Sequence, residues 1–489
     1  MNSQVIRIQK IEMKNLKNIE YGKIEFNSYK KRYYYDNTSE VIGIYGQNGS
    51  GKTSVINALE ILKLLISGES LFSDINEYIY QLSDSMNLNY VFYMNKNEKD
   101  LLIYYEVEIT KDHDSFSILR EKLSYKEVNK SNVEFEYTNS NKDASKTIEN
   151  TTQSKTTIME IVDDNNKFPL LPQKRYNELI RYNKENEIDI QVTKKICKKN
   201  KSSFIFNEDT IDMFRYNSEY FNILNSLFYY STTNLFIINS RHSANICLNF
   251  MPINFRFEES RQIHLLNGRN TNITRVESGN IPIDITKEIS ISKEDYYVIN
   301  KVLDQMNIVL DKIIPKLEIE LSELGKDFNE KGKELIKAEL FSLRGDVKVP
   351  LRYESEGIKK IISILSTLIS VFNYPSVCLA VDELDSGVFE FLLGEILEIL
   401  KNHGKGQLIF TSHNLRALEK LSKENIVIST TNSKKRFKQI TNVKLTNNLR
   451  DMYLRSIVLG APEESIYDST NSYEISHAFR KAGAIFGQK

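Results

Sequence analysis

The segment that decides the fold reads Gly46-Gln47-Asn48-Gly49-Ser50-Gly51-Lys52-Thr53. The apolar run before it, residues 40–45, predicts a short buried strand. Residues 53–66 follow with apolar side chains at helical spacing on one face. Glycines between a strand and a helix let backbone N–H groups point at phosphate oxygens, helped by the positive end of the helix dipole. The segment therefore predicts a phosphate-binding loop.

Each residue of this loop has an expected part in holding ATP and Mg²⁺. We expect Lys52 to hold the β- and γ-phosphates and the Thr53 hydroxyl to ligate Mg²⁺. The alternative is a glycine turn that happens to precede a helix, and the flanking strand and helix favour the phosphate loop. The predicted nucleotide-binding residues here are Gly46, Gln47, Asn48, Gly49, Ser50, Gly51, Lys52, Thr53 and Ser54.

A second apolar strand ends in two acids, Cys378-Leu379-Ala380-Val381-Asp382-Glu383. We expect Asp382 to bind Mg²⁺ through water and Glu383 to act as the general base on the attacking water. Taken alone, such a run often marks only the end of a strand. A third apolar run ends in Thr411-Ser412-His413-Asn414. A histidine at a strand end is usually structural, but the position of His413 after the two acids favours a role in catalysis.

The rest of the chain predicts an α/β fold with a mixed central sheet, an antiparallel β lobe and a largely helical insertion. Strands are expected in residues 4–26 and 90–109, and a hairpin between 318 and 343. A helix is expected over residues 295–314, with Val298, Val302, Met306, Val309 and Ile313 on one core-facing stripe. An apolar helix is expected over residues 358–372. We divide the chain into residues 1–115 with the phosphate loop, an insertion 116–345, and residues 346–489 with the acids and the histidine.

Bulk composition limits the class of protein but not its partner. Lysine plus arginine and aspartate plus glutamate number 65 each in the 489 residues, so net charge argues for neither nucleic acid nor membrane. Cys197, Cys247 and Cys378 lie far apart, as expected of free thiols in a reducing compartment. The sequence shows no apolar leader and no run of about 20 apolar residues. We therefore expect a cytoplasmic protein without a membrane partner.

The ordered set of motifs resembles the heads of SMC/RecF-type ABC ATPases. In that comparison, residues 46–53 match Walker A, Ser355-Glu356-Gly357 the signature, Asp382-Glu383 Walker B, Asp385 the D-loop and His413 the switch histidine. The resemblance implies a P-loop NTPase of ABC-head type that hydrolyses ATP with Lys52, Glu383 and His413. It also implies a homodimer or larger homo-oligomer. The residues implied to contact the nucleotide beyond the loop are Ser355, Gly357 and Asp385, together with Lys17 and Asn18.

Several positions depart from that family's pattern or leave alternatives open. The family's signature usually reads Leu-Ser-Gly-Gly, but here Glu354 precedes the serine and Glu356 stands at the first glycine. An ordinary helix cap would explain Ser355 equally well. Lys17-Asn18 is a common dipeptide. No glutamine of a Q-loop is identified, and Arg241 is a candidate contact for phosphate or nucleic acid near the expected place of that loop.

The branch of the family follows from what fills the chain between the motifs. About 300 residues of mixed content separate the two halves, without the long heptad arms of full SMC proteins. In residues 353–360 (Tyr-Glu-Ser-Glu-Gly-Ile-Lys-Lys) and 411–414 (Thr-Ser-His-Asn) the chain resembles stand-alone bacterial ATPases of abortive-infection and overcoming-lysogeny type. Residues 414–489 are too few for the Toprim domain of overcoming-lysogeny nucleases. This implies the sensor subunit of a phage-defence system, with a separately encoded effector such as a Toprim or HNH nuclease.

Two rival interpretations remain open at this level. The first is a RecF-like DNA-repair ATPase that clamps duplex DNA across its dimer. The second is a nucleotide-gated interaction module in which Glu383 has no role in turnover. The basic run 434–438 (Lys-Lys-Arg-Phe-Lys) is a candidate contact for nucleic acid or for the effector, and a solvated loop is its alternative explanation.

Overall fold

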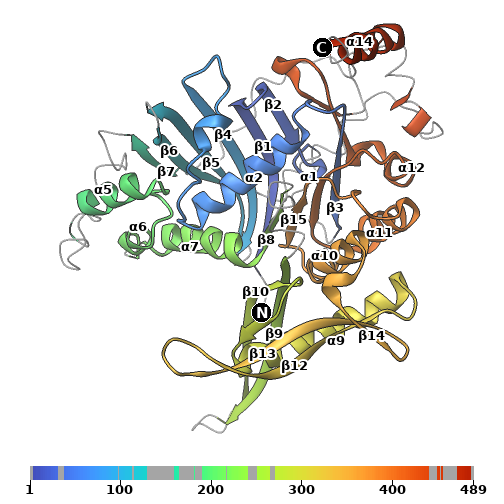
Figure 1. Cartoon of the computed structure of the whole chain (residues 1–489). Helices are drawn as coiled ribbons and strands as arrows, with labels where there is room; N and C mark the ends of the chain where they lie inside the picture. The colour runs from blue at the N-terminus through green and yellow to red at the C-terminus, as the bar shows by residue number, and fades with distance from the viewer. Residues whose placement is uncertain are drawn as a thin grey trace, which may run out of the picture.

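The computed structural model describes residues 4–30, 38–96, 99–112, 115–128, 159–164, 181, 190–215, 217–239, 250–264, 270–439, 449–451, 453–454 and 471–485. Figure 1 shows an antiparallel lobe from the first part of the chain beside a lobe that combines β3 with the last third. Two long β-hairpins from the middle of the chain project away from both. The predicted α/β architecture with an antiparallel β lobe is confirmed.

The first lobe is built on an antiparallel sheet. Within the described residues its six strands run in the order β2-β1-β4-β5-β6-β7. Alternating buried and partly buried positions, as in residues 103–110 of β5, give the strand one face toward the core. The strands are β1 (Val5–Leu16), β2 (Ile19–Glu25), β4 (Ser85–Lys96), β5 (Lys99–Asp112), β6 (Ser115–Val128) and β7 (Met159–Asp164).

The central sheet brings both ends of the chain together. Its order in the described residues is β18-β17-β3-β16-β15-β8, and every pair is parallel except β17 with β18. Its strands are β3 (Glu40–Tyr45), β8 (Leu235–Ile238), β15 (Cys378–Val381), β16 (Gln407–Thr411), β17 (Ile426–Ser429) and β18 (Phe437–Gln439). Because parallel strands end at the same edge, the loops that follow β3, β15 and β16 meet there.

Alternate residues of the central strands face two different cores. In β15, Cys378 and Ala380 pack with the antiparallel sheet and with α2 (Lys52–Ile66). Leu379 and Val381 pack on the opposite face with α10 (Glu356–Asn373) and α11 (Glu390–His403). Burial on both faces explains why β15 is a continuous apolar run in the sequence.

The middle of the chain contains more strand than the largely helical insertion that we expected. β6 and β7 continue the first antiparallel sheet, so the boundary predicted between residues 115 and 116 falls within β6. β9 (Phe250–His264) pairs with β10 (Asn270–Asp284), and β11 (Ile289–Ile291), β12 (Glu318–Phe328), β13 (Glu334–Arg344) and β14 (Val347–Pro350) form a further sheet. The helices are α5 (Ile190–Asn200), α6 (Glu208–Met213), α7 (Ser218–Thr233) and α9 (Lys293–Ile313).

Helix α9 lies where the sequence predicted it, but its buried stripe differs. Ser292 caps its N-terminus by accepting a hydrogen bond from the backbone N–H of Asp295. The buried residues are Ile299, Val302, Leu303, Met306 and Leu310. Val298, Val309 and Ile313, which we expected on the core side, are only partly buried. The face of α9 that packs against β12, β13 and α10 is therefore rotated slightly around the helix axis from the predicted face.

The remaining elements are short or terminal. They are α1 (Asn27–Lys30), α12 (Ala417–Lys420), α14 (Ser472–Ile485) and the 3₁₀ turns Ile75–Tyr78, Leu351–Tyr353, Lys423–Asn425 and Ser433–Lys435. Cys197 and Cys378 are buried free thiols, and Cys247 lies outside the described residues. Among the helices that the structure describes, none has the length and apolarity needed to cross a membrane.

Gln407, the first residue of β16, joins the two sheets through its side chain. Its amide donates to the backbone oxygen of Ile8 at 2.7 Å and to Glu40 Oε2 at 3.0 Å. Its amide oxygen accepts from the backbone N–H of Ile8 at 2.8 Å. One buried side chain thus satisfies both main-chain groups of an N-terminal strand residue. These hydrogen bonds join the antiparallel lobe to the central sheet, at an inter-sheet interface formed by Ile8, Glu40 and Gln407.

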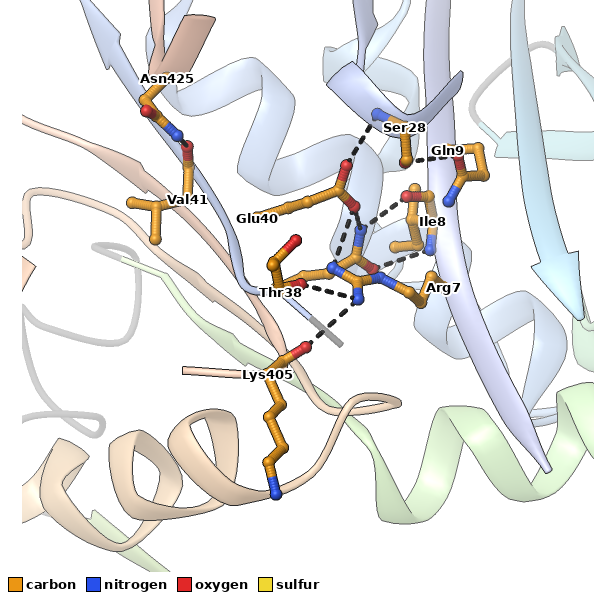
Figure 2. A network of polar contacts seen from close by, with 10 residues as sticks. Arg7, Ile8, Gln9, Ser28, Thr38, Glu40, Val41, Lys405 and Asn425 are labelled. Atoms are coloured by element: carbon orange, nitrogen blue, oxygen red, sulfur yellow. Dashed lines mark hydrogen bonds and ion pairs between the residues drawn. The ribbon is translucent and has the colours of Figure 1, made fainter. Parts of the chain in front are cut away.

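Arg7, on β1, makes further contacts across this inter-sheet interface. Its guanidinium donates to Glu40 Oε2 at 3.1 Å and to the backbone oxygen of Lys405 at 3.2 Å. The side chain is only 2% exposed. A buried charge is tolerated at such a place when it is paired and hydrogen-bonded. Arg7 therefore also links residues near the start of the chain to residues near its end, as Figure 2 shows.

Replacing Gln407 by leucine should lower the free energy of unfolding by about 3 kcal/mol, because the buried N–H and C=O of Ile8 would both lose their partner. Urea unfolding followed by circular dichroism measures the change. Gln439→Leu is the matched control, since the Gln439 side chain donates a peripheral hydrogen bond of 3.3 Å to the Glu25 backbone oxygen. An equal loss of unfolding free energy in the two variants would show that the inter-sheet hydrogen bonds of Gln407 contribute no more to stability than a peripheral hydrogen bond.

Candidate nucleotide-binding site

The predicted phosphate loop lies between β3 and α2, as the sequence indicated. Gly49 and Gly51 have φ of 79° and 89°, a left-handed conformation that glycine adopts without steric cost. Lys52 is buried, and its ammonium donates to the backbone oxygens of Gly46 at 2.9 Å and Gln47 at 3.0 Å. The lysine therefore curls over the loop at the N-terminus of α2, where an anion is favoured.

Two contacts from outside the loop hold its shape. A Cβ on Gly46 would lie 2.1 Å from Ser429 Oγ, so only glycine fits beside the end of β17. The Ser429 hydroxyl also contacts the Ser50 hydroxyl at 2.5 Å. On the other side, Asn18 Nδ2 donates to the Gly49 carbonyl. Asn18 thus contacts the phosphate loop, and its predicted contact with the nucleotide stays a prediction. Ser429 is a supporting residue that sequence reasoning missed.

The acids at the end of β15 lie against the start of α2. Thr53 Oγ1 donates to Asp382 Oδ1 at 3.3 Å, although the two residues are far apart in sequence. Thr411, at the end of β16, donates to the same carboxylate oxygen at 2.6 Å and accepts from the Glu383 backbone N–H at 2.7 Å. The structure therefore brings together Lys52, Thr53, Asp382 and Glu383. Thr411 was missed, and its signal was a polar residue that closes an apolar strand.

The donor set at this place suits a hard cation held together with phosphate. Thr53 and Asp382 offer a hydroxyl and a carboxylate, and Mg²⁺ usually takes one or two carboxylates plus phosphate oxygens and water. Within the described residues no group of three or more His, Cys, Asp or Glu side chains could hold a metal by itself. A cation at Asp382 would therefore need ligands from a bound phosphate and from water.

The charge balance of the site follows from burial and three nearby carboxylates. Burial lowers the pKa of Lys52, and the negative charges of Asp382, Glu383 and Asp385 act in the opposite direction. Removing the ammonium from water costs free energy that an anionic phosphate would offset. The Lys52 ammonium and the three nearby carboxylates form an arrangement that can hold a triphosphate together with Mg²⁺.

Asp385 and His413 meet at the same edge of the sheet. The backbone N–H of His413 donates to Asp385 Oδ2 at 3.0 Å. Asp385 Oδ1 is buried without a hydrogen-bond partner in the described part of the chain. The side chains of Glu383 and His413 are exposed. Both predicted catalytic groups are thus free to face a nucleotide or a second copy of the chain.

The predicted signature residues lie at the N-terminus of α10. Ser355 is exposed and accepts a 3.4 Å hydrogen bond from the backbone N–H of Ile358, so the helix cap is real. Capping leaves the other N–H groups of the first turn available, so it does not exclude an anion contact. Among the described contacts none joins Ser355 or Gly357 to the phosphate loop of the same chain. A Cβ on Gly357 would instead meet the Gly387 oxygen at 2.1 Å.

The departure at Glu354 has a local structural reason. Its carboxylate receives two hydrogen bonds from Arg344, at 2.6 and 3.0 Å, and one from the Ser342 hydroxyl at 2.6 Å. The ion pair with Arg344 lowers the pKa of Glu354. Glu354 therefore ties the segment before α10 to strand β13, a role that leucine in the usual family pattern would not fill.

Lys17 is engaged inside the first lobe. Its ammonium lies 4.2 Å from the ring centroid of Tyr78 and donates to Asn57 Oδ1. Asn57 is buried on α2, so this contact braces the β1–β2 turn against the helix that follows the loop. The predicted nucleoside contact by Lys17 would require the side chain to leave these partners.

Arg241 and the basic run 434–438 were the remaining candidate contacts for phosphate, nucleic acid or the effector. Arg241 lies outside the described residues, whereas Asn239 at the end of β8 is buried and donates to Glu60 at 2.7 Å. In the basic run 434–438, Arg436 is buried and donates to the backbone oxygens of Thr430 and Asn18. The solvated-loop alternative therefore fails for Arg436, which supports the turn that carries Asn18.

Comparison with known proteins adds one family and several solved structures. The family model described as "AAA domain, putative AbiEii toxin, Type IV TA system" matches residues 41–419. No curated protein sequence matches the chain. The Smc head domain from Pyrococcus furiosus with an extended coiled coil, bound to the C-terminal domain of ScpA, is 11% identical over 89% of this chain and 97% of that chain, with a TM-score of 0.38. The SMC head domain from Thermotoga maritima is 12% identical over 89% of this chain and 100% of that chain, with a TM-score of 0.33. The recombination mediator protein RecF with ATP is 13% identical over 84% of this chain and 94% of that chain, with a TM-score of 0.32.

Replacing Thr411 by valine should lower both the stability of the protein and its rate of ATP hydrolysis. The Glu383 backbone N–H and Asp382 would lose the hydroxyl between them, at a cost of about 2 kcal/mol to the free energy of unfolding. Urea unfolding and a phosphate-release assay measure the two effects. Thr411→Ser, which keeps the hydroxyl, should stay near the wild type, and an equal loss in both variants would contradict the assigned contacts.

Proposed function

The chain belongs to the AAA-domain family named for the AbiEii toxin, and is therefore an ATPase; from this premise we propose that it is the nucleotide-gated sensor of a bacterial anti-phage defence system. The contact between Thr53 and Asp382 carries the catalytic part of the proposal, because it assembles the phosphate loop and the acids into one site. The name of the family, with its toxin and Type IV TA system, supports the biological part.

The residues of the chain have distinct tasks in this proposal. Lys52 and the N–H groups at the start of α2 hold the phosphates, and Thr53 and Asp382 hold Mg²⁺. When bound, Mg²⁺ would neutralise charge that develops on the phosphate oxygens. Glu383 accepts a proton from the attacking water, and His413 stands at the same edge of the sheet to orient it.

A second copy of the chain completes the site in this proposal. Glu383, His413 and Ser355 are all exposed, and Ser355 makes no described contact with the phosphate loop of its own chain. The N-terminus of α10 presents positive helix dipole and free N–H groups, which suit the γ-phosphate held by a partner protomer. ATP would thus join two copies, and hydrolysis would release them.

The defence role adds a separately encoded effector, such as a Toprim or HNH nuclease, whose activity depends on the nucleotide state. The resemblance to abortive-infection and overcoming-lysogeny ATPases supports this partner. The RecF-like alternative requires a DNA-binding surface. Arg436, in the basic run considered for that contact, is buried and occupied with backbone oxygens, so it adds nothing to such a surface.

Glu383→Gln should bind ATP with normal affinity and hydrolyse it about 100-fold more slowly, the usual scale for loss of a general base. Lys52→Ala should lose ATP binding altogether. Fluorescent-ATP titration and phosphate release separate the two effects. Equal turnover in the wild type and Glu383→Gln would select the non-catalytic interaction module, and normal ATP affinity of Lys52→Ala would refute the assigned phosphate loop.

Expression of the gene together with its chromosomal neighbours should reduce phage plating, and Glu383→Gln or Lys52→Ala should abolish the protection. Plating efficiency across a phage panel measures this effect. The repair alternative would instead be supported if the variants plated phage like the wild type while the purified protein bound duplex DNA more tightly with ATP, in a salt-sensitive manner and without a partner.

A further inference from the structure

The backbone of Glu383 adopts a conformation that must be held in place. Its φ is +49°, in the left-handed region that residues with a side chain rarely occupy. Thr411 fixes the N–H side of the residue at 2.7 Å, and the Ser386 N–H donates to the Glu383 carbonyl at 3.0 Å. The turn that aims the proposed general base is therefore determined by its neighbours as well as by its own residue type.

A buried lysine from α10 supplies another of these contacts. Lys360 is only 6% exposed, and its ammonium donates to the backbone oxygen of Glu383. Burial lowers the pKa of Lys360, while the carboxylates of Asp385, Glu383 and Asp382 oppose that effect. A side chain required only for packing would not carry a charge here, because burying an ammonium is unfavourable unless it is paired. The position of Lys360 thus points to a task at the Glu383 turn.

Helix α10 touches the same segment at a second point. A Cβ on Gly357, in the first turn, would lie 2.1 Å from the Gly387 oxygen, so the two backbones are in direct contact. Lys360 lies one turn further along the helix and reaches Glu383. The start of α10 is therefore joined to residues 383–387 at both ends of that segment.

We propose that Lys360 is a positioning residue for ATP hydrolysis, which holds the Glu383 turn and links it to the N-terminus of α10. The proposal rests on the role of Glu383 proposed above and deepens it. The helix that presents Ser355 to a partner's γ-phosphate also holds the general base of its own chain. Engagement of Ser355 at one site then affects the geometry of Glu383 at the other site of the dimer.

The test replaces Lys360 by methionine, which keeps the volume and removes the donor. We expect kcat to fall about tenfold or more, the factor that corresponds to losing one hydrogen bond from a charged group. The ATP dissociation constant should stay within about threefold of the wild type, since Lys360 acts on the chemical step. The melting temperature should change little, because the Glu383 carbonyl keeps its hydrogen bond from the Ser386 N–H.

Two variants control this experiment. Lys63→Met removes a partly buried lysine near the C-terminal end of α2, whose pKa is likewise lowered by burial, and it should leave kcat unchanged. Lys360→Gln keeps a polar group on a shorter side chain that cannot reach the carbonyl, so it should reproduce the loss of kcat if the methionine variant fails to fold. Wild-type kcat in a folded Lys360 variant, with Glu383→Gln inactive, would overturn the proposal. Absence of hydrolysis in the wild type would overturn the role of Glu383 as well.

Discussion

The parallel pairing of β3 with β16 is the constraint on which the site depends. It places residues 40–44 beside residues 407–411, with Glu40 opposite Gln407. Since β15 lies on the other side of β16, the phosphate loop, the acids and Thr411 follow three neighbouring strands at one edge. The side chain of Gln407 extends the same pairing to Ile8, and the antiparallel lobe is thereby fixed against the sheet that carries the chemistry.

The parts of the fold that could be predicted are those with a local signal. Glycines, lysine and threonine of the phosphate loop occur at a spacing that its mechanism demands, and the buried strand and helix beside it have clear periodicities. The acids Asp382 and Glu383 were visible because an apolar run ends in them. Pairing these two segments required no structure, since the chemistry of one site needs both.

The parts that could not be predicted depend on contacts between distant segments. Lys360 is one of two adjacent lysines on a helix, and its sequence does not distinguish it from a solvated residue. Ser429 and Arg436 support the phosphate loop from the end of the chain, but short strands such as β17 and β18 give a weak pattern. The long hairpin β9–β10 was missed although residues 251–257 alternate apolar with other side chains. Lys17 contacts Tyr78 and Asn57 within the first lobe, which its position in the sequence does not reveal.

The split of the central sheet has a consequence for how the chain is made on the ribosome. The strands β1, β2, β4, β5 and β6 have all been translated by residue 128, so most of the first sheet is able to form early. β3 can pair with its neighbours in the central sheet only after β16 and β17, which end at residues 411 and 429, have been synthesised. At bacterial and eukaryotic translation speeds this delay is on the order of tens of seconds. Throughout that interval the nascent polypeptide carries an unpaired apolar strand and cannot bind nucleotide, which makes it a natural client for chaperones.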